Sequence, residues 1–393
     1  MKLFISLLLL LVSAGSSFAS PSTWAKAKIE ALQKMCDTDT LLTTSQLGLY
    51  VYDLTANAPL FAHNEKHRMR PASCQKLVTS IAALHFLGSQ YEALTNFFYA
   101  GAVMNGTLYG NIYVEGGMDP LLHEQDLKYA VEALQRAGID SIAGGICVDL
   151  SRKDTLRWGE GWCWDDEDGP LSALLIDGKA SVQAPLLRQF LSSGLRLANR
   201  DSVLNAVCPP GATLFCQLIH SLPQMLLPAL KESDNMVAES IFYQLAFQTS
   251  FRNAGAPQAI ACIKGLMNQL DISPRAYTVA DGSGLSLYNY TTAETLVALL
   301  RYAHSQEDIF VPLQQALPVA GEDGTLIRRM QDTAAKHRVW AKTGTVTGVS
   351  SLAGYLLSGE GHLLAFAIIN QGIEKTRQGR DFQDRVCELL ATE

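Results

Sequence analysis

Three short motifs in a fixed order constrain this 393-residue chain more than any other feature. Ser73-Cys74-Gln75-Lys76 is an S-x-x-K motif at the start of an apolar helical pattern. Ser233-Asp234-Asn235 begins a second helical pattern, and Lys342-Thr343-Gly344 lies near the end of a predicted strand. Each motif alone is weak evidence, because a serine three positions before a lysine arises easily by chance. Together, and each in its expected structural context, they indicate one site assembled from distant segments.

The spacing of the first motif suits nucleophilic catalysis by a serine. Residues three positions apart share a helix face, so Lys76 is expected beside the Ser73 hydroxyl. That hydroxyl is a poor nucleophile until a base removes its proton, and lysine is a base only when neutral. Burial and a nearby cation both lower a lysine pKa, and Lys342 could supply the cation. Taken alone, the first motif would indicate a serine N-cap and a solvated lysine, and the other two motifs count against that alternative.

Hydrophobic patterning predicts a mixed α/β chain (α+β) whose ends form one unit interrupted by a different module. We therefore expect a catalytic domain at 20–94 and 222–393 and an inserted domain at 95–221. Strands or strand-like segments are predicted at 46–53, 59–63, 95–115, 142–150, 338–345, 349–358 and 362–370. Helices are predicted at 22–35, 71–86, 124–137, 184–194, 222–231, 234–248, 256–270, 291–305 and 377–391.

The N-terminus has the pattern of a secretory signal peptide. Lys2 precedes an apolar run at 3–12, and Ser17-Phe18-Ala19 fits the small-x-small rule for cleavage. The run is short for a membrane span, so we expect residues 1–19 to be removed, with a retained anchor as the alternative. The prediction is an exported protein without a stable membrane anchor, in the periplasm or at the cell exterior.

Charge and composition narrow the possible partners. The chain has 31 Lys and Arg against 38 Asp and Glu, a net charge of −7, so it lacks the basic excess that nucleic-acid binding requires. A hydrophobic fraction of 48% is ample for a buried core and argues against disorder.

The sequence predicts neither a metal site nor a cofactor. The eight cysteines are scattered without a C-x-x-C pair, so zinc-site spacing is absent. Two disulfide bonds are possible, Cys208–Cys216 and Cys147–Cys163, and buried free thiols are the alternative. The histidine pair at 63 and 67 is expected in an exposed polar loop, with metal binding as the alternative. The acidic run at 165–168 is expected to be a solvated loop or a structural stretch, with cation binding as the alternative.

The three motifs are those of penicillin-recognising serine enzymes. The chain resembles the low-molecular-mass class C penicillin-binding proteins, the D-alanyl-D-alanine carboxypeptidases and endopeptidases of bacterial cell walls. The resemblance covers most of the chain after the leader. Beyond the first two motifs, it rests on segments 117–121, 161–166, 231–239, 281–286, 321–326 and 342–345.

This resemblance implies a penicillin-recognising serine transpeptidase-like fold, with a five-stranded antiparallel sheet flanked by helices and one smaller inserted α/β domain. It also implies the catalytic roles. Ser73 would attack the carbonyl of the penultimate D-Ala with Lys76 as general base, forming an acyl-enzyme that water releases. Ser233 and Lys342 would pass a proton to the leaving amine, and Asn235 would orient Lys76 and the substrate.

Substrate binding is implied for Thr343, Gly344 and Thr345. The backbone N–H groups of Ser73 and Thr345 would form the oxyanion hole, and Thr343 and Lys342 would hold the substrate carboxylate. Peptidoglycan peptides and β-lactams are therefore the expected partners. No catalytic role follows for the 281–286 segment, for which a tight glycine-rich turn is the alternative.

The chain departs from the family pattern at two points, and two other functions are alternatives to the peptidase. The short segment between the first two motifs indicates that the nested third domain of larger family members is missing or vestigial. Cys74, turned away from Lys76 by the helix, is expected to pack in the core. A secreted β-lactamase would need a deacylating Glu or Tyr that no motif supplies here. A non-catalytic wall-binding or sensing module is the other alternative.

Overall fold

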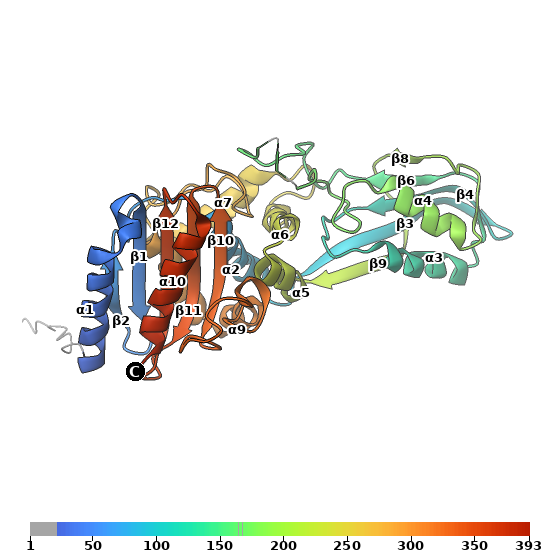
Figure 1. Ribbon diagram of the computed structural model, residues 1–393. Helices are drawn as coiled ribbons and strands as arrows, with labels where there is room; N and C mark the ends of the chain where they lie inside the picture. The colour runs from blue at the N-terminus through green and yellow to red at the C-terminus, as the bar shows by residue number, and fades with distance from the viewer. Residues whose placement is uncertain (1–21, 164, 167) are drawn as a thin grey trace, which may run out of the picture.

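The computed structural model describes residues 22–163, 165–166 and 168–393. They form two lobes, each built on its own β-sheet, and Figure 1 shows the lobes at opposite ends of an elongated molecule. The predicted signal peptide, residues 1–19, lies outside the described residues. Within the described ranges, no helix is both long and apolar enough to cross a bilayer.

The first lobe contains a five-stranded antiparallel sheet in the order β10-β11-β12-β1-β2. Its central strands are almost wholly buried because helices cover both faces, so they are continuous apolar runs rather than alternating ones. The N-terminal and C-terminal parts of the chain join in one sheet where β1 pairs with β12. The strands are β1 (Gln46–Asp53), β2 (Ala58–His63), β10 (Val339–Val346), β11 (Val349–Leu357) and β12 (Leu363–Gln371).

Helices form a layer on each face of this sheet. One face packs against α1 (Thr23–Thr38) and α10 (Thr376–Ala391), which share an apolar cluster with the strands. The other face packs against the helices that carry the first two motifs. These and their neighbours are α2 (Gln75–Leu87), α5 (Leu222–Leu227), α6 (Asn235–Phe247), α7 (Ala256–Gln269), α8 (Ala293–His304) and α9 (Glu307–Ala316).

The second lobe has a mixed seven-stranded sheet with its own apolar cluster. Antiparallel pairs join β3 to β4 and to β9, and the shorter strands add in parallel. Two helices, α3 (Leu127–Arg136) and α4 (Gln183–Ser192), pack on it. The strands are β3 (Glu92–Met104), β4 (Thr107–Glu115), β5 (Ser141–Ile142), β6 (Ile146–Asp149), β7 (Arg196–Leu197), β8 (Val203–Asn205) and β9 (Thr213–Ser221).

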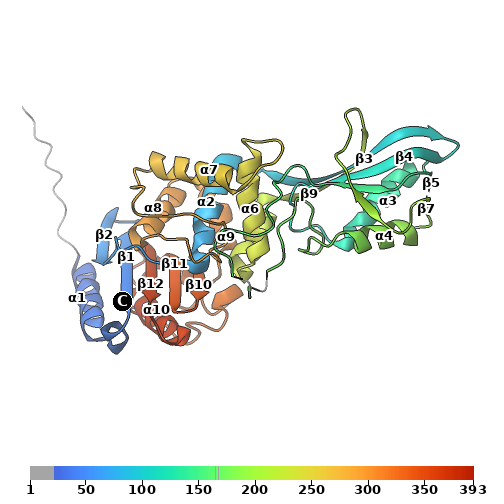
Figure 2. The ribbon, with the colours of Figure 1, turned by 90° about the horizontal axis from the view of Figure 1, so that it is seen from above.

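The chain leaves the first lobe and returns to it at adjacent positions. Glu92, at the start of β3, pairs with Ser221, at the end of β9, and both strands run between the lobes in Figure 2. A third crossing is the segment 151–175. Its backbone bonds to Asn253 and Ala254, and Leu171 and Leu175 join the core of the first lobe. Residues 95–221, which the sequence predicted as one inserted domain, thus contribute to the hydrophobic cores of both lobes.

All eight cysteines lie among the described residues and are free thiols, so neither of the two candidate disulfide bonds is formed. Cys147 is buried in β6, whereas Cys163 is exposed in the loop that follows. Cys208 and Cys216 are both partly buried.

Candidate active site

The first motif lies on a tight turn that leads into α2. Ala72 has a left-handed backbone (φ +48°), which is unusual for a residue with a side chain, and a 3-10 turn over Ala72–Cys74 continues directly into the helix. Lys76 is completely buried, and its Nζ lies 3.0 Å from Ser73 Oγ. The predicted pairing of serine and lysine on one helix face is therefore present.

The second motif begins α6. A π-helical turn (Pro228–Glu232) ends at Ser233, which is also left-handed (φ +66°), and the Asp234 carboxylate caps α6 by accepting the N–H of Val237. Asn235 is the first helical residue. Its Oδ1 accepts a hydrogen bond from Lys76 Nζ at 2.6 Å, so the second motif directly contacts the first.

The third motif lies on β10, the edge strand next to α2. Lys342 is buried, and its Nζ donates to Ser233 Oγ at 2.9 Å and to the Thr343 carbonyl at 2.8 Å. Gly344 lets the strand approach the nucleophile turn closely. A Cβ at this position would lie 2.6 Å from the Pro71 carbonyl oxygen and 3.0 Å from the Ser73 nitrogen.

The structure brings all eight predicted site residues together around one cleft of about 470 Å³. Ser73, Ser233, Thr343 and Thr345 line it. Behind this lining, Lys76 contacts Ser73 and Asn235, and Lys342 contacts Ser233. Gly344 packs against the Ser73 backbone. The cleft wall also includes Gly324 and Thr325, from the 321–326 segment, and four residues that the sequence did not single out, namely Ile327, Arg328, Arg329 and Arg380.

Burial makes both lysines unusually weak bases. It lowers the pKa of Lys76 to about 8, against the opposing charges of carboxylates such as Asp281 and Glu239. It lowers the pKa of Lys342 to about 7, and the charge of Lys76 adds to that shift. The repulsion between the two ammonium groups is mutual, so the pair gives up one of its two protons more readily than either lysine would alone.

The 281–286 segment, for which the sequence suggested no role, holds Lys76 in place. The Ser283 carbonyl accepts a hydrogen bond from Lys76 Nζ at 2.8 Å. Glu239 on α6 fixes that carbonyl by accepting the backbone N–H groups of Gly282 and Ser283 at 3.0 and 2.8 Å. Gly284 is left-handed (φ +84°), and a Cβ there would lie 1.9 Å from the Ala72 carbonyl oxygen. The glycines thus permit close packing around the nucleophile turn.

Two residues of the 151–175 crossing also reach the site. Trp162 Nε1 donates to Asp281 Oδ2 at 2.9 Å and so anchors the loop that holds Lys76. Asn235 Nδ2 donates to Asp168 Oδ2 at 2.8 Å. Of the two interpretations of the acidic run, the structural stretch fits Asp168 and the solvated loop does not, because Asp168 is partly buried and burial raises its pKa. Trp164 and Glu167 lie outside the described residues.

Cys74 packs in the core, as its place on the helix suggested. Its thiol is completely buried and donates to the Lys342 carbonyl at 3.2 Å, so it helps to hold β10 against the nucleophile turn. Burial raises the pKa of this thiol, which disfavours the reactive thiolate.

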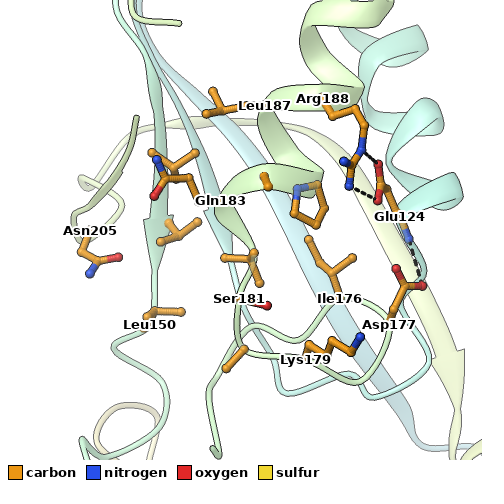
Figure 3. Close-up of a pocket in the computed structure, with 16 residues that line it drawn as sticks. Glu124, Leu150, Ile176, Asp177, Lys179, Ser181, Gln183, Leu187, Arg188 and Asn205 are labelled. Atoms are coloured by element: carbon orange, nitrogen blue, oxygen red, sulfur yellow. Dashed lines mark hydrogen bonds and ion pairs between the residues drawn. The ribbon is translucent and has the colours of Figure 1, made fainter. Parts of the chain in front are cut away.

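A separate pocket of about 830 Å³ lies in the second lobe (Figure 3). It is lined by α4 and by the ends of β6 and β8, and the carboxylate of Glu124 pairs with the guanidinium of Arg188 on its wall. None of the eight predicted site residues lines it. Among the described residues, no cluster of three or more His, Cys, Asp or Glu side chains could hold a metal ion.

Comparison with known proteins identifies relatives that match most of the chain. It is 26% identical to the D-alanyl-D-alanine carboxypeptidase DacB of Haemophilus influenzae over 89% of both chains. It is 30% identical to the carboxypeptidase Rv3627c of Mycobacterium tuberculosis over 81% of this chain and 74% of that protein. The fold matches the crystal structure of penicillin binding protein 4 (dacB) from H. influenzae with a TM-score of 0.81 and 23% identity, over 91% and 99% of the two chains.

These matches confirm the resemblance suggested by the three motifs, the penicillin-recognising serine peptidase-like fold, and a serine-type hydrolase. A family match covers residues 29–184 and 175–393, nearly the whole chain. The chain belongs to the D-Ala-D-Ala carboxypeptidase 3 (S13) family.

Proposed function

We propose that the chain is a D-alanyl-D-alanine carboxypeptidase that acts on peptidoglycan stem peptides, with Ser73 as the nucleophile of an acyl-enzyme. The observation that carries this proposal is the 3.0 Å contact between Ser73 Oγ and the buried Nζ of Lys76. Because burial lowers the pKa of Lys76 to about 8, a usable fraction of this lysine is neutral near pH 7 and can take the serine proton.

The remaining contacts support a role for each other motif residue. The backbone N–H groups of Ser73 and Thr345 would stabilise the oxyanion, an arrangement that depends on the close approach of Gly344. The contact from Lys342 Nζ to Ser233 Oγ provides a path for a proton to the departing amine. Asn235, held between Lys76 and Asp168, would orient the lysine.

Acylation and deacylation then follow from these positions. Ser73 Oγ bonds to the carbonyl carbon of the penultimate D-Ala, and its proton passes to Lys76. The bond to the terminal D-Ala breaks as that amine receives a proton through Ser233. Water attacks the ester and releases the shortened peptide, which regenerates the Ser73 hydroxyl. β-Lactams would acylate the same serine. A cross-linked D-Ala bond presents the same carbonyl, so endopeptidase activity is a second proposal.

We also propose that the chain is exported by its first 19 residues and that it has two domains. The catalytic domain would comprise 20–94 and 222–393, and the insert 95–221. Adjacent exit and return points at Glu92 and Ser221 support this division, although the 151–175 crossing packs on the catalytic side. N-terminal sequencing of the secreted protein tests the cleavage site, and a first residue other than Ser20 would refute it.

Covalent labelling by a fluorescent penicillin, with D-Ala release from a pentapeptide, tests the catalytic proposal. We expect the wild type to label and to release D-Ala, Ser73→Ala to do neither, and Lys76→Ala to label at least 10³-fold more slowly. Equal labelling of wild type and Ser73→Ala would refute the assignment. Labelling without D-Ala release would favour the binding module, and rapid penicillin turnover would favour a β-lactamase.

A further inference from the structure

The α10 helix contributes a cation to the wall of the active-site cleft. Figure 1 shows α10 packed across one face of the five-stranded sheet. Arg380, in its second turn, extends to the end of β10 and donates from Nη2 to Thr345 Oγ1 at 3.2 Å. Arg380 and Thr345 both line the cleft that holds Ser73, although neither belongs to the same helix as the nucleophile.

The backbone that carries Arg380 is held firmly in place. Arg329, which follows the turn that contains Thr325, pairs with Asp384 of α10 at 2.6 Å. The same guanidinium donates to the Arg380 carbonyl at 3.3 Å and to Gln383 Oε1 at 3.1 Å. Arg329 therefore joins this turn of α10 to the cleft wall, and the position of Arg380 is fixed by contacts on both sides.

Among the described residues, Arg380 differs from three nearby arginines in lacking an anionic partner. Arg328, on the same cleft wall, also lacks one there, but the arginine that donates to Thr345 is Arg380. Arg377, Arg385 and Arg329 pair with Asp381, Asp39 and Asp384, respectively. Across residues 22–163, 165–166 and 168–393, no carboxylate lies within ion-pair distance of Arg380. One of its N–H groups contacts Thr345, and the planar guanidinium has four more that can bind an anion. The cleft thus has a cation whose charge is not neutralised by this part of the chain.

The hydroxyl of Thr345 is complementary to the same anion. It accepts the hydrogen bond from Arg380, so its own O–H remains available to donate. No acceptor for that O–H lies within hydrogen-bond distance among the residues that the structure describes. Both groups therefore present donors to the cleft in which the scissile bond would lie.

The leaving residue of the proposed substrate supplies that anion. In a D-Ala-D-Ala peptide, a carboxylate stands one residue beyond the scissile carbonyl, on the side of the departing amine. Lys342 is a poor permanent partner for it, because this lysine is buried, already donates to Ser233 and Thr343, and loses its charge near neutral pH. An arginine keeps its charge throughout that range and can bind a carboxylate through two parallel hydrogen bonds.

We propose that Arg380 determines specificity for the free carboxylate of the leaving residue, which it binds together with the hydroxyl of Thr345. This inference rests on the proposed peptidase function and adds to it a residue outside the three motifs. It makes the enzyme selective for peptides that carry a carboxylate on the residue after the scissile bond.

The test compares two pentapeptides that differ only at the C-terminus, one ending in D-Ala-D-Ala carboxylate and the other in the corresponding amide. We expect Arg380→Gln to lower kcat/KM about 10-fold for the carboxylate, chiefly through KM, and to leave the amide nearly unchanged. Arg380→Lys should recover part of the loss because it restores the charge. The matched control is Arg377→Gln on the same helix, whose partner is Asp381 and which does not line the cleft.

Each outcome decides the proposal. A loss confined to the carboxylate peptide supports it. An equal loss on both peptides means that Arg380 only maintains the structure, and no loss means that the carboxylate binds elsewhere, so either result overturns it. If wild type turns over the amide too slowly to measure, acylation rates with a penicillin and its methyl ester provide the same ratio. Failure of the wild type to release D-Ala from any peptide would instead refute the proposed function.

Discussion

The replacement Gly344→Ala tests how closely β10 must approach the nucleophile turn. The added Cβ would lie 2.1 Å from Ser351 Oγ, 2.6 Å from the Pro71 carbonyl oxygen and 3.0 Å from the Ser73 nitrogen. The serine hydroxyl can rotate away, but the other two atoms belong to the backbone that carries the nucleophile. Ordinary contact begins at 3.4 Å, so the strand and the turn must separate by about 0.8 Å.

That displacement should impair catalysis more than folding. A misplacement of about 1 Å in a catalytic group costs roughly 10²-fold in rate, or about 2.7 kcal/mol of barrier. Overpacking of this kind costs about 1–3 kcal/mol of stability, which a folded domain can tolerate. We therefore expect the second-order rate of penicillin acylation to fall about 10²-fold while the thermal transition shifts by only several degrees.

The assay is stopped-time labelling by a fluorescent penicillin, well below the melting temperature of the variant. The matched control is Gly265→Ala in α7, where the nearest atom to the added Cβ is a ring carbon of Phe86 at 3.8 Å. This variant should acylate at the wild-type rate and be slightly more stable. If Gly344→Ala acylates within threefold of wild type, the close approach of β10 is not required for catalysis.

Three further predictions test other parts of the site. Because acylation needs one neutral and one protonated lysine, kcat/KM should increase as the pH is raised to about 7. It should be maximal between about 7 and 8 and fall at higher pH as the last proton of the pair is lost. A rate that keeps rising past pH 9 would contradict this. Trp162→Phe keeps a smaller aromatic ring but removes the donor to Asp281, so it should cost about 1 kcal/mol of stability in urea titrations and slow labelling several-fold. Unchanged kinetics would show that Lys76 does not depend on this anchor. Cys74 should resist iodoacetamide in the native protein and react only after unfolding, by mass spectrometry; rapid native alkylation with loss of activity would refute its burial.

Local patterns in the sequence predicted most elements of the first lobe. The strand at 46–53 has the bounds of β1, and the helix that begins at Pro71 follows the turn and α2 to within a residue. The helix α9 was missed, because Pro312 inside it argues against a helix. In the second lobe β9 was missed. It has large apolar side chains exposed on its surface, among them Leu214 and Ile219, and so lacks the usual alternation of buried and exposed residues.

The proximity of the eight candidate site residues was predictable, because each lies in or directly beside a motif whose spacing encodes a local geometry. The groups that hold them were not. Ser283 acts through its backbone carbonyl, which no side-chain pattern reveals, and Asp168 is brought to Asn235 by a chain crossing between lobes. Arg380 is one of several arginines on an amphipathic helix, and only tertiary contacts distinguish it from its paired neighbours.

The 151–175 crossing has a consequence for the evolution and engineering of this enzyme. Although the second lobe is attached through adjacent strands and would therefore look easy to excise, the residues between β6 and α4 form part of the machinery that holds the lysine beside Ser73. A shortened enzyme that joined Glu92 directly to Ser221 would lack both Trp162 and Asp168. Such a chain would lose two contacts that position Lys76 and Asn235, and we expect it to acylate more slowly, so the insert and the active site are constrained to change together.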